Sequence, residues 1–160
     1  MSDFRLDRID SAERGENPMV ISRMESGFAV IGDTQFLPGY TVLLASPQVA
    51  RLTELDHPAR RAFLFDMSLI GEALERACAN DGLVRVNYEI LGNTDAFLHA
   101  HIFPRYSWEE PERLRKPPFL YPPDRWTDPA YQYIEHVHGQ LREQIRLALV
   151  DLIASSTKEL

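Results

Sequence analysis

The sequence predicts an α+β domain in which helices cover one face of an antiparallel sheet of about five strands. Three short apolar segments follow one another near the start, a helical pattern comes next, and two strand-like segments precede a second helical pattern. Strands in runs, with helices between and after them, favour an α+β fold over a doubly wound α/β fold. The 160 residues, 44% of them hydrophobic, are enough for one domain with a buried core.

The chain begins with a polar stretch and three strands. Residues 1–18 are polar and end in the turn-forming pair Asn17-Pro18, which predicts a weakly structured N-terminal arm. A strand begins at residues 19–21, a turn at residues 25–27 leads into a second strand at residues 28–31, and Pro38-Gly39 precedes a third at residues 40–45. Short consecutive strands of this kind predict an antiparallel meander.

The period of the apolar residues then changes from two to 3.6. From Pro58 to about Asn80, apolar residues recur at spacings of three and four: Phe63, Met67, Ile70, Leu74 and Cys78. This spacing predicts an amphipathic helix, with Asp56 or His57 as its cap and residues 80–82 as its stop signal. Because Cys78 continues the stripe, we expect a buried small hydrophobe rather than a reactive thiol.

The second half of the chain contains a hairpin, a Pro-rich segment and a last helix. Strand-like residues 83–91 and 96–103 flank a turn at residues 92–95 and predict paired strands. A second amphipathic pattern runs from about Asp128 to Ile153, with an expected stripe of Ile134, Val137, Leu141, Ile145 and Leu152. Residues 19–106 would form the domain core, and residues 107–160 would pack on the same domain.

Charge and composition exclude several classes of function. Seventeen Lys and Arg face 24 Asp and Glu, a net charge of -7, whereas binding to long nucleic acids depends on basic side chains. The sequence has no apolar run of the roughly 18 to 20 residues that span a bilayer and no secretory signal. We therefore expect a soluble cytoplasmic protein without long nucleic-acid or membrane partners. Cys78 is the single cysteine, which excludes an intrachain disulfide and a thiolate-rich metal site.

The most informative segment is residues 97–105, FLHAHIFPR. On a strand, alternate residues share a face, so His99 and His101 are neighbours on one face, with Phe97 and Phe103 beside them. Leu98, Ala100 and Ile102 lie on the other face, which we expect to pack on the helices. The same alternation places Arg85 and Asn87 of the preceding strand beside the histidines.

Imidazole can act as nucleophile, base or acid near neutral pH, so the pair is a candidate for phosphoryl chemistry. Gly92 lets a backbone approach a phosphate closely, and Asn93 and Thr94 can donate hydrogen bonds to it. Two alternatives stay open at this point. The histidines are packed and structural, or they bind a metal ion, although the carboxylate spacing of common metal sites is absent around them.

The segment GNTDAFLHAHIFPR resembles the signature of the histidine triad (HIT) family, which reads Gly-Gln-Ser/Thr and then His-x-His-x-His with two apolar residues and often Pro-Arg. In this register His101 matches the last His, His99 the middle one, and Phe97 replaces the first. Gly92 and Asn93 match the Gly-Gln pair, and Thr94 the Ser or Thr. The order of elements over residues 19–106 is also similar, which implies a HIT-like fold.

The resemblance implies a nucleotide hydrolase or transferase that needs no metal or other cofactor. His99 would attack an α-phosphate to give a nucleotidyl-histidine, and His101 would contact the phosphate or assist the leaving group. Asp33 would bind the ribose, and Asn87 matches a frequent Asn of the family. Diadenosine polyphosphates and nucleoside phosphoramidates are substrates in this family, and homodimers are usual. Loss of turnover with the first His, which leaves a nucleotide-binding module, is the alternative.

Other residues have less specific interpretations. His57 lies near a helix cap, and His136 and His138 lie two apart on a helix, so none is expected in the site. The aromatic residues of the Pro-rich segment, Trp108, Phe119, Tyr121 and Trp126, either stack on a base or anchor the segment to the core. Arg113, Arg115 and Lys116 form a basic cluster that is expected in a solvated loop.

Overall fold

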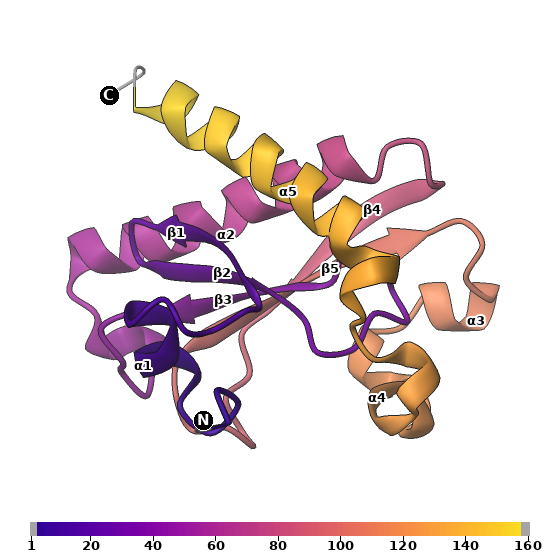
Figure 1. Cartoon of the computed structure of the whole chain (residues 1–160), viewed down its shortest axis with the longest axis horizontal. Helices are drawn as coiled ribbons and strands as arrows, with labels where there is room; N and C mark the ends of the chain where they lie inside the picture. Colours follow the sequence, from indigo (N-terminus) through magenta and orange to yellow (C-terminus); the bar gives the residue numbers. More distant parts are fainter. Residues whose placement is uncertain (1–2, 158–160) are drawn as a thin grey trace.

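A computed structural model describes residues 3–157. Its centre is one antiparallel sheet of five strands in the order β1-β2-β3-β5-β4 (Figure 1). The strands are β1 (Val20–Met24), β2 (Gly27–Ile31), β3 (Thr41–Ala45), β4 (Leu83–Glu89) and β5 (His99–Tyr106). The meander and the terminal hairpin are both confirmed, and β5 lies between β3 and β4.

Two long helices, α2 (His57–Ala77) and α5 (Glu135–Ser156), lie on the same face of the sheet (Figure 1). The side chain of Asp56 accepts a hydrogen bond from the backbone N–H of Ala59 at 2.9 Å, so the expected cap of α2 is confirmed. The main core forms between this helical layer and the sheet. It includes Leu43, Ala100 and Ile102 from the strands and Phe63, Ile70, Leu74, Ile145 and Leu149 from the helices.

The N-terminal arm is more ordered than the sequence predicts. Residues Arg8–Glu13 form helix α1, and Ile9 and Ala12 on this helix are buried in the main core. The expectation of a weakly structured arm is therefore wrong for the described part, residues 3–18. Burial of these two apolar residues offsets the low stability of so short a helix.

The C-terminal helix also differs from its prediction. Helix α5 begins at Glu135 rather than near Asp128, because Pro129–Tyr131 form a separate 3₁₀ turn, η3. Ile134 and Val137 are exposed, so they do not belong to the buried stripe, whereas Ile145, Leu149 and Leu152 do. The first turns of α5 thus extend past the sheet before the helix reaches the core.

The Pro-rich segment folds into short helical pieces rather than a plain loop. They are α3 (Pro111–Leu114), η2 (Pro118–Leu120) and α4 (Asp124–Thr127). One further 3₁₀ turn, η1 (Leu52–Glu54), precedes α2. None of the helices in residues 3–157 is long and apolar enough to cross a membrane.

Candidate functional site

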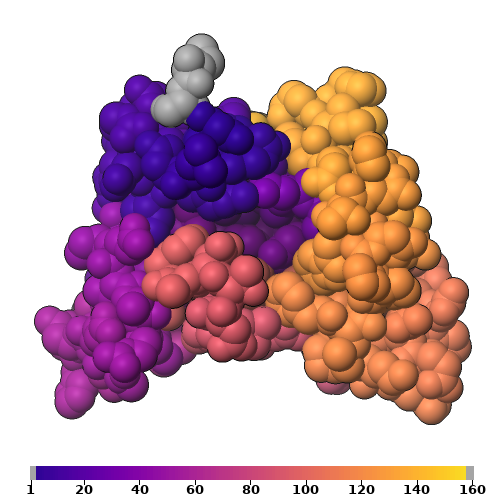
Figure 2. Space-filling model, turned by 90° about the horizontal axis from the view of Figure 1, so that it is seen from below, coloured from indigo at the N-terminus to yellow at the C-terminus, as the bar shows by residue number. Residues whose placement is uncertain are grey.

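A cavity of about 260 Å³ lies on the sheet face opposite α2 and α5. Figure 2 shows this face as a hollow between the N-terminal segment, in indigo, and the orange segment that leads into α5. Strands β2, β3 and β5 form the floor with Val30, Val42, Leu44, His99 and His101. The walls come from α1, from the loop before β5 and from η2 and α4, which contribute Arg8, Asp95, Phe97, Phe119 and Trp126.

The alternation predicted for β5 is confirmed, and it brings both histidines to the cavity. Ala100 and Ile102 are fully buried against the helices, while His99 and His101 line the cavity. The two imidazole rings lie 4.7 Å apart, centroid to centroid, and meet edge to face at 82°. Packing on one face of β5 therefore fixes the position of the two imidazoles on the other.

His99 is oriented by the backbone immediately before its strand. Its Nδ1 lies 2.7 Å from the carbonyl oxygen of Phe97, and the residue is 7% exposed. A carbonyl oxygen accepts hydrogen bonds and cannot donate one, so Nδ1 carries the proton. In the neutral ring the second nitrogen, Nε2, has a lone pair, which is the form that a nucleophile requires.

His101 has a different partner, the phenol of Tyr40, whose oxygen lies 2.7 Å from Nδ1. Burial, with a smaller contribution from the charge of the neighbouring His99, lowers the pKa of His101 from 6.5 to about 3, so His101 is neutral at physiological pH. Burial raises the pKa of Tyr40 far above its usual value, so the phenol keeps its proton. The edge of Phe119 closes the site beside His101, with the ring centroids 4.9 Å apart.

Phe97, at the position where the resemblance to the histidine triad signature implies a third imidazole, packs beside His99. Its ring centroid lies 4.8 Å from that of His99, and β5 begins two residues later, at His99. Within residues 3–157, no group of three or more His, Cys, Asp or Glu side chains is placed to hold a metal ion. The two histidines thus stand without a metal-ligating third partner in the described part of the chain.

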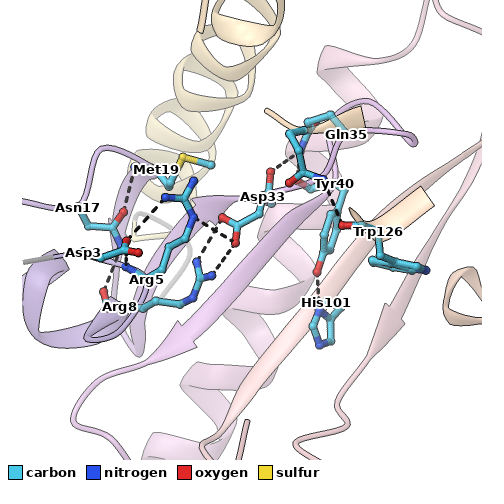
Figure 3. A network of polar contacts seen from close by, with 12 residues as sticks. Asp3, Arg5, Arg8, Asn17, Met19, Asp33, Gln35, Tyr40, His101 and Trp126 are labelled. Carbon is cyan, nitrogen blue, oxygen red and sulfur yellow. Dashed lines mark hydrogen bonds and ion pairs between the residues drawn. The ribbon is translucent and has the colours of Figure 1, made fainter. Parts of the chain in front are cut away.

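Asp33, the predicted ribose contact, lines the cavity just after β2. It is held by Arg8 of α1, whose two terminal nitrogens lie 2.5 and 3.3 Å from the two carboxylate oxygens. Figure 3 shows Asp33 between this arginine and the pair formed by Tyr40 and His101. The N-terminal helix therefore contributes a charged side chain to the site, which the sequence does not indicate.

Three other predicted contacts do not line the main cavity. Gly92 borders a neighbouring cavity of about 130 Å³ that His99 also lines, and it adopts a left-handed backbone with φ of +73°. Asn93 and Thr94 are exposed and line neither of these two cavities. The turn at residues 92–95 directs Asp95, rather than these two side chains, toward the histidines.

Asn87 is not at the histidines either, because its side-chain oxygen accepts a hydrogen bond from Arg105 at 2.7 Å. Arg105 is 1% exposed and ion-paired with the buried Glu109 at 2.9 Å. It also donates to the backbone carbonyls of Arg113 and Lys116. Arg85 is exposed and pairs across the strands with Arg105. Arg105, at the Pro-Arg end of the motif, therefore has a structural role, because it connects β5 to the segment that follows it.

That segment forms the aromatic wall of the cavity. Phe119 and Trp126 stack in parallel with their centroids 4.7 Å apart, and both line the cavity. Trp126 also contacts Phe36 edge to face at 4.9 Å, while Trp108 stacks on Tyr106 away from the histidines. Phe119 and Trp126 both pack on the buried Phe103 and also face the site, whereas Trp108 is 56% exposed.

The remaining histidines and the cysteine lie outside the site, as expected. His57 is exposed at the start of α2. His138 is partly exposed in the first turns of α5, where its Nδ1 accepts the backbone N–H of Ile134 at 2.9 Å. Cys78 is buried, and burial raises the pKa of its thiol, which disfavours the reactive thiolate.

Several polar residues of the site are not predicted from the sequence, among them Tyr40, Arg8 and Asp95. Tyr40 could have been found from strand parity, since it precedes Val42 and Leu44 by two and four residues and so shares their face. Arg8 carries no such signal, because α1 is six residues long and its position depends on tertiary contacts.

Comparison with known proteins gives structural similarity alone, since no protein-family model and no curated protein matches the sequence. A histidine triad protein from Sinorhizobium meliloti 1021 is 19% identical with a TM-score of 0.65, covering 92% of this chain and 96% of its own. A hypothetical histidine triad nucleotide-binding protein from Sulfolobus tokodaii is 18% identical with a TM-score of 0.64, covering 90% and 91%. The chain has the histidine triad fold.

A third neighbour with this fold is a zinc-bound histidine triad family protein from Mycobacterium smegmatis, at 19% identity and a TM-score of 0.56 over 91% of this chain and 94% of its own. The predicted HIT-like architecture is therefore confirmed. The five-stranded sheet of this chain carries His99 and His101 on β5, and Phe97 comes two residues before His99.

Proposed function

We propose that this protein binds a nucleotide in the cavity and hydrolyses it at the α-phosphate through His99. The observation that carries the proposal is the hydrogen bond from His99 Nδ1 to the Phe97 carbonyl. In the neutral ring it leaves a lone pair on Nε2, beside a cavity on the sheet face opposite α2 and α5. A neutral imidazole with a fixed orientation suits in-line attack on phosphorus.

The reaction would proceed in two steps. In the first, the lone pair of His99 Nε2 forms a bond to the α-phosphorus, and the bond from phosphorus to the leaving oxygen or nitrogen breaks with its electron pair. The leaving group takes a proton from water. In the second, a water oxygen bonds to phosphorus, the N–P bond returns its electrons to Nε2, and the proton of that water goes to solvent. The products are a nucleoside monophosphate and the protonated leaving group.

The chemistry of the cavity also bears on the substrate. Arg8 is the cationic side chain among the lining residues and is already paired with Asp33, while Asp95 adds a second carboxylate. Two carboxylates repel a long polyphosphate chain more than a single phosphoryl group. A nucleoside phosphoramidate therefore fits this charge pattern better than a diadenosine polyphosphate, although both contain the α-phosphate that His99 would attack.

A direct test mixes the protein with adenosine 5′-phosphoramidate and, separately, diadenosine tetraphosphate in the presence of a chelator. Release of adenosine monophosphate and an adenylyl adduct in the intact-protein mass spectrum would support the proposal. His99→Ala should abolish both signals, while His57→Ala, at the exposed start of α2, should keep both. Absence of product from both substrates would overturn the proposal that the protein is a hydrolase.

A nucleotide-binding module without turnover is the second candidate, and Phe97 favours it. A phenylalanine beside His99 supplies neither a proton nor a hydrogen bond, unlike the imidazole of the histidine triad signature. Calorimetry that shows tight binding of adenosine monophosphate, with no product and no adduct from either substrate, would select this module.

We also propose that the protein forms a homodimer through its β4 edge. Strand β4 ends the sheet, so one row of its backbone N–H and C=O groups lacks a strand partner in the described chain. Val84 and Tyr88 on this strand are 51% and 42% exposed, and the neighbouring α2 exposes Leu64 and Phe65. Light scattering should give twice the mass of the chain for the wild type and the monomer mass for Val84→Lys.

A further inference from the structure

We infer that Tyr40 is a positioning residue that holds His101 in the tautomer whose Nε2 carries the proton. The hydrogen bond of 2.7 Å between the phenol and Nδ1 of His101 carries this inference. The Phe97 carbonyl holds His99 in the opposite tautomer. One imidazole would thus present a lone pair and the other an N–H to the same cavity. The inference deepens the proposed function and rests on it for its catalytic consequence.

The direction of the Tyr40 hydrogen bond follows from what a buried hydroxyl requires. Tyr40 is 6% exposed, and a buried O–H without an acceptor costs free energy. Among the described residues, Nδ1 of His101 is the acceptor within hydrogen-bonding distance of this oxygen. The phenol therefore donates, Nδ1 carries no proton, and a neutral His101 must have its proton on Nε2.

The packing around Tyr40 fixes the position of its phenol, and so favours one tautomer of His101. Its ring stacks on Phe103 with centroids 4.2 Å apart and an angle of 10°. On another side, Gly32 lies so close that a Cβ atom there would be 2.3 Å from a ring carbon of Tyr40. The stacked ring and the close backbone of Gly32 hold the phenol with its hydroxyl beside His101 (Figure 3).

Opposite tautomers would divide the work between the two histidines without a third imidazole. His99 supplies the nucleophilic lone pair. His101, as a neutral donor, would contact a phosphoryl oxygen on which negative charge develops, as a fixed dipole rather than as a source of protons. Because a neutral imidazole is a very weak acid, the proton for the leaving group comes from water.

The tautomers can be measured in the resting protein, independently of any substrate. Two-bond ¹⁵N–¹H spectra of histidine-labelled protein at neutral pH distinguish Nδ1–H from Nε2–H rings, and His99→Gln and His101→Gln variants assign the signals. We expect an Nδ1–H ring for His99 and an Nε2–H ring for His101. An Nδ1–H ring for His101 in the wild type would overturn the inference.

Tyr40→Phe keeps the stacked ring and removes the hydroxyl. His101 should then populate both tautomers, while the His99 signal stays in its original form. With the substrate that the protein turns over, kcat should fall about 10- to 100-fold and KM should change much less. Tyr133→Phe, which removes a hydroxyl that contacts Glu135 away from the cavity, is the matched control and should leave kcat and the histidine spectra unchanged.

The outcomes separate this inference from the proposed function. If the wild type shows the expected tautomers but no substrate is hydrolysed, the proposed function fails and the positioning role stands. If the wild type is active and Tyr40→Phe retains both the activity and the Nε2–H signal of His101, Tyr40 is not a positioning residue. If Tyr40→Phe unfolds, the wild-type spectrum still decides which ring nitrogen of His101 carries the proton, and an Nδ1–H ring there overturns the inference.

Discussion

Two guanidinium nitrogens of Arg8, on α1, donate hydrogen bonds to the carboxylate of Asp33, which follows β2 and lies 25 residues later in the sequence. The pair is partly buried at the rim of the cavity, with Asp95 near enough to raise the pKa of Arg8 further through its charge. A carboxylate keeps further lone pairs when it accepts a bidentate arginine, so Asp33 can still accept a hydroxyl hydrogen bond. The N-terminal helix is therefore part of the site.

We expect Arg8→Gln to weaken the binding of adenosine monophosphate about tenfold, which is about 1.4 kcal/mol. Without the guanidinium, Asp33 and Asp95 would face an anionic ligand uncompensated. Titration calorimetry at low salt measures the change. Arg5→Gln is the matched control, because Arg5 is more exposed and its Nε lies 3.9 Å from Asp33, so its effect should be smaller. Equal losses for both variants would contradict a specific role of Arg8.

The parts of this fold that the sequence predicts well are those where one face of an element is buried. Along β5, a shift of one residue would place the histidines in the core, so the alternation specifies both the burial and the site. Helix α2 is similarly well signalled, because Asp56 caps it and its apolar stripe meets the sheet. Local pattern and tertiary packing agree in these two elements.

The parts that the sequence predicts poorly depend on contacts between distant segments. The match of Asn93 and Thr94 to the histidine triad motif gives their order in the chain, but the conformation of the loop places Asp95 toward the cavity instead. Asn87 has the expected strand parity, yet the buried Arg105 is its closest hydrogen-bonding partner. Helix α1 is stabilised by Ile9 and Ala12, which pack on core residues that are distant in the sequence.

Asp95→Asn should favour the more highly charged substrate. Removing this carboxylate reduces repulsion for a polyphosphate more than for a phosphoramidate, because the former carries more negative charge. We expect kcat/KM for diadenosine tetraphosphate to rise severalfold relative to that for adenosine 5′-phosphoramidate, with a smaller gain at high salt. Glu112→Gln on α3 makes the same charge change away from the cavity and should alter neither ratio. An unchanged ratio in Asp95→Asn would show that Asp95 does not face the leaving group.

Glu109→Gln should destabilise the protein strongly. Glu109 and Arg105 are both buried, and the loss of one charge leaves the other without its partner, which costs about 3 kcal/mol or more. Tyr121 also donates to Glu109 at 2.7 Å, so the segment that carries Phe119 should loosen with it. Urea unfolding followed by tryptophan fluorescence measures the loss. The adjacent Glu110→Gln is the control, and a loss there as large as that of Glu109→Gln would exclude the buried pair as the cause.

His101 should make the protein sensitive to acid in a defined pH window. The pKa of His101 is about 3 in the folded state and near 6.5 in the unfolded chain. Between these two pH values the unfolded chain binds a proton at this residue and the folded protein does not. Stability associated with this residue is fully present above pH 6.5 and is lost as the pH falls toward 3, by at most about 1.4 kcal/mol per pH unit.

His101→Gln removes this contribution, so the difference in unfolding free energy between the wild type and the variant should shift in favour of the variant from pH 7 to pH 4. His136→Gln, in the exposed first turn of α5, should show no comparable shift. A difference between the wild type and His101→Gln that stays constant over this range would mean that the pKa of His101 is the same in the folded and unfolded protein, which would contradict its lowering by burial.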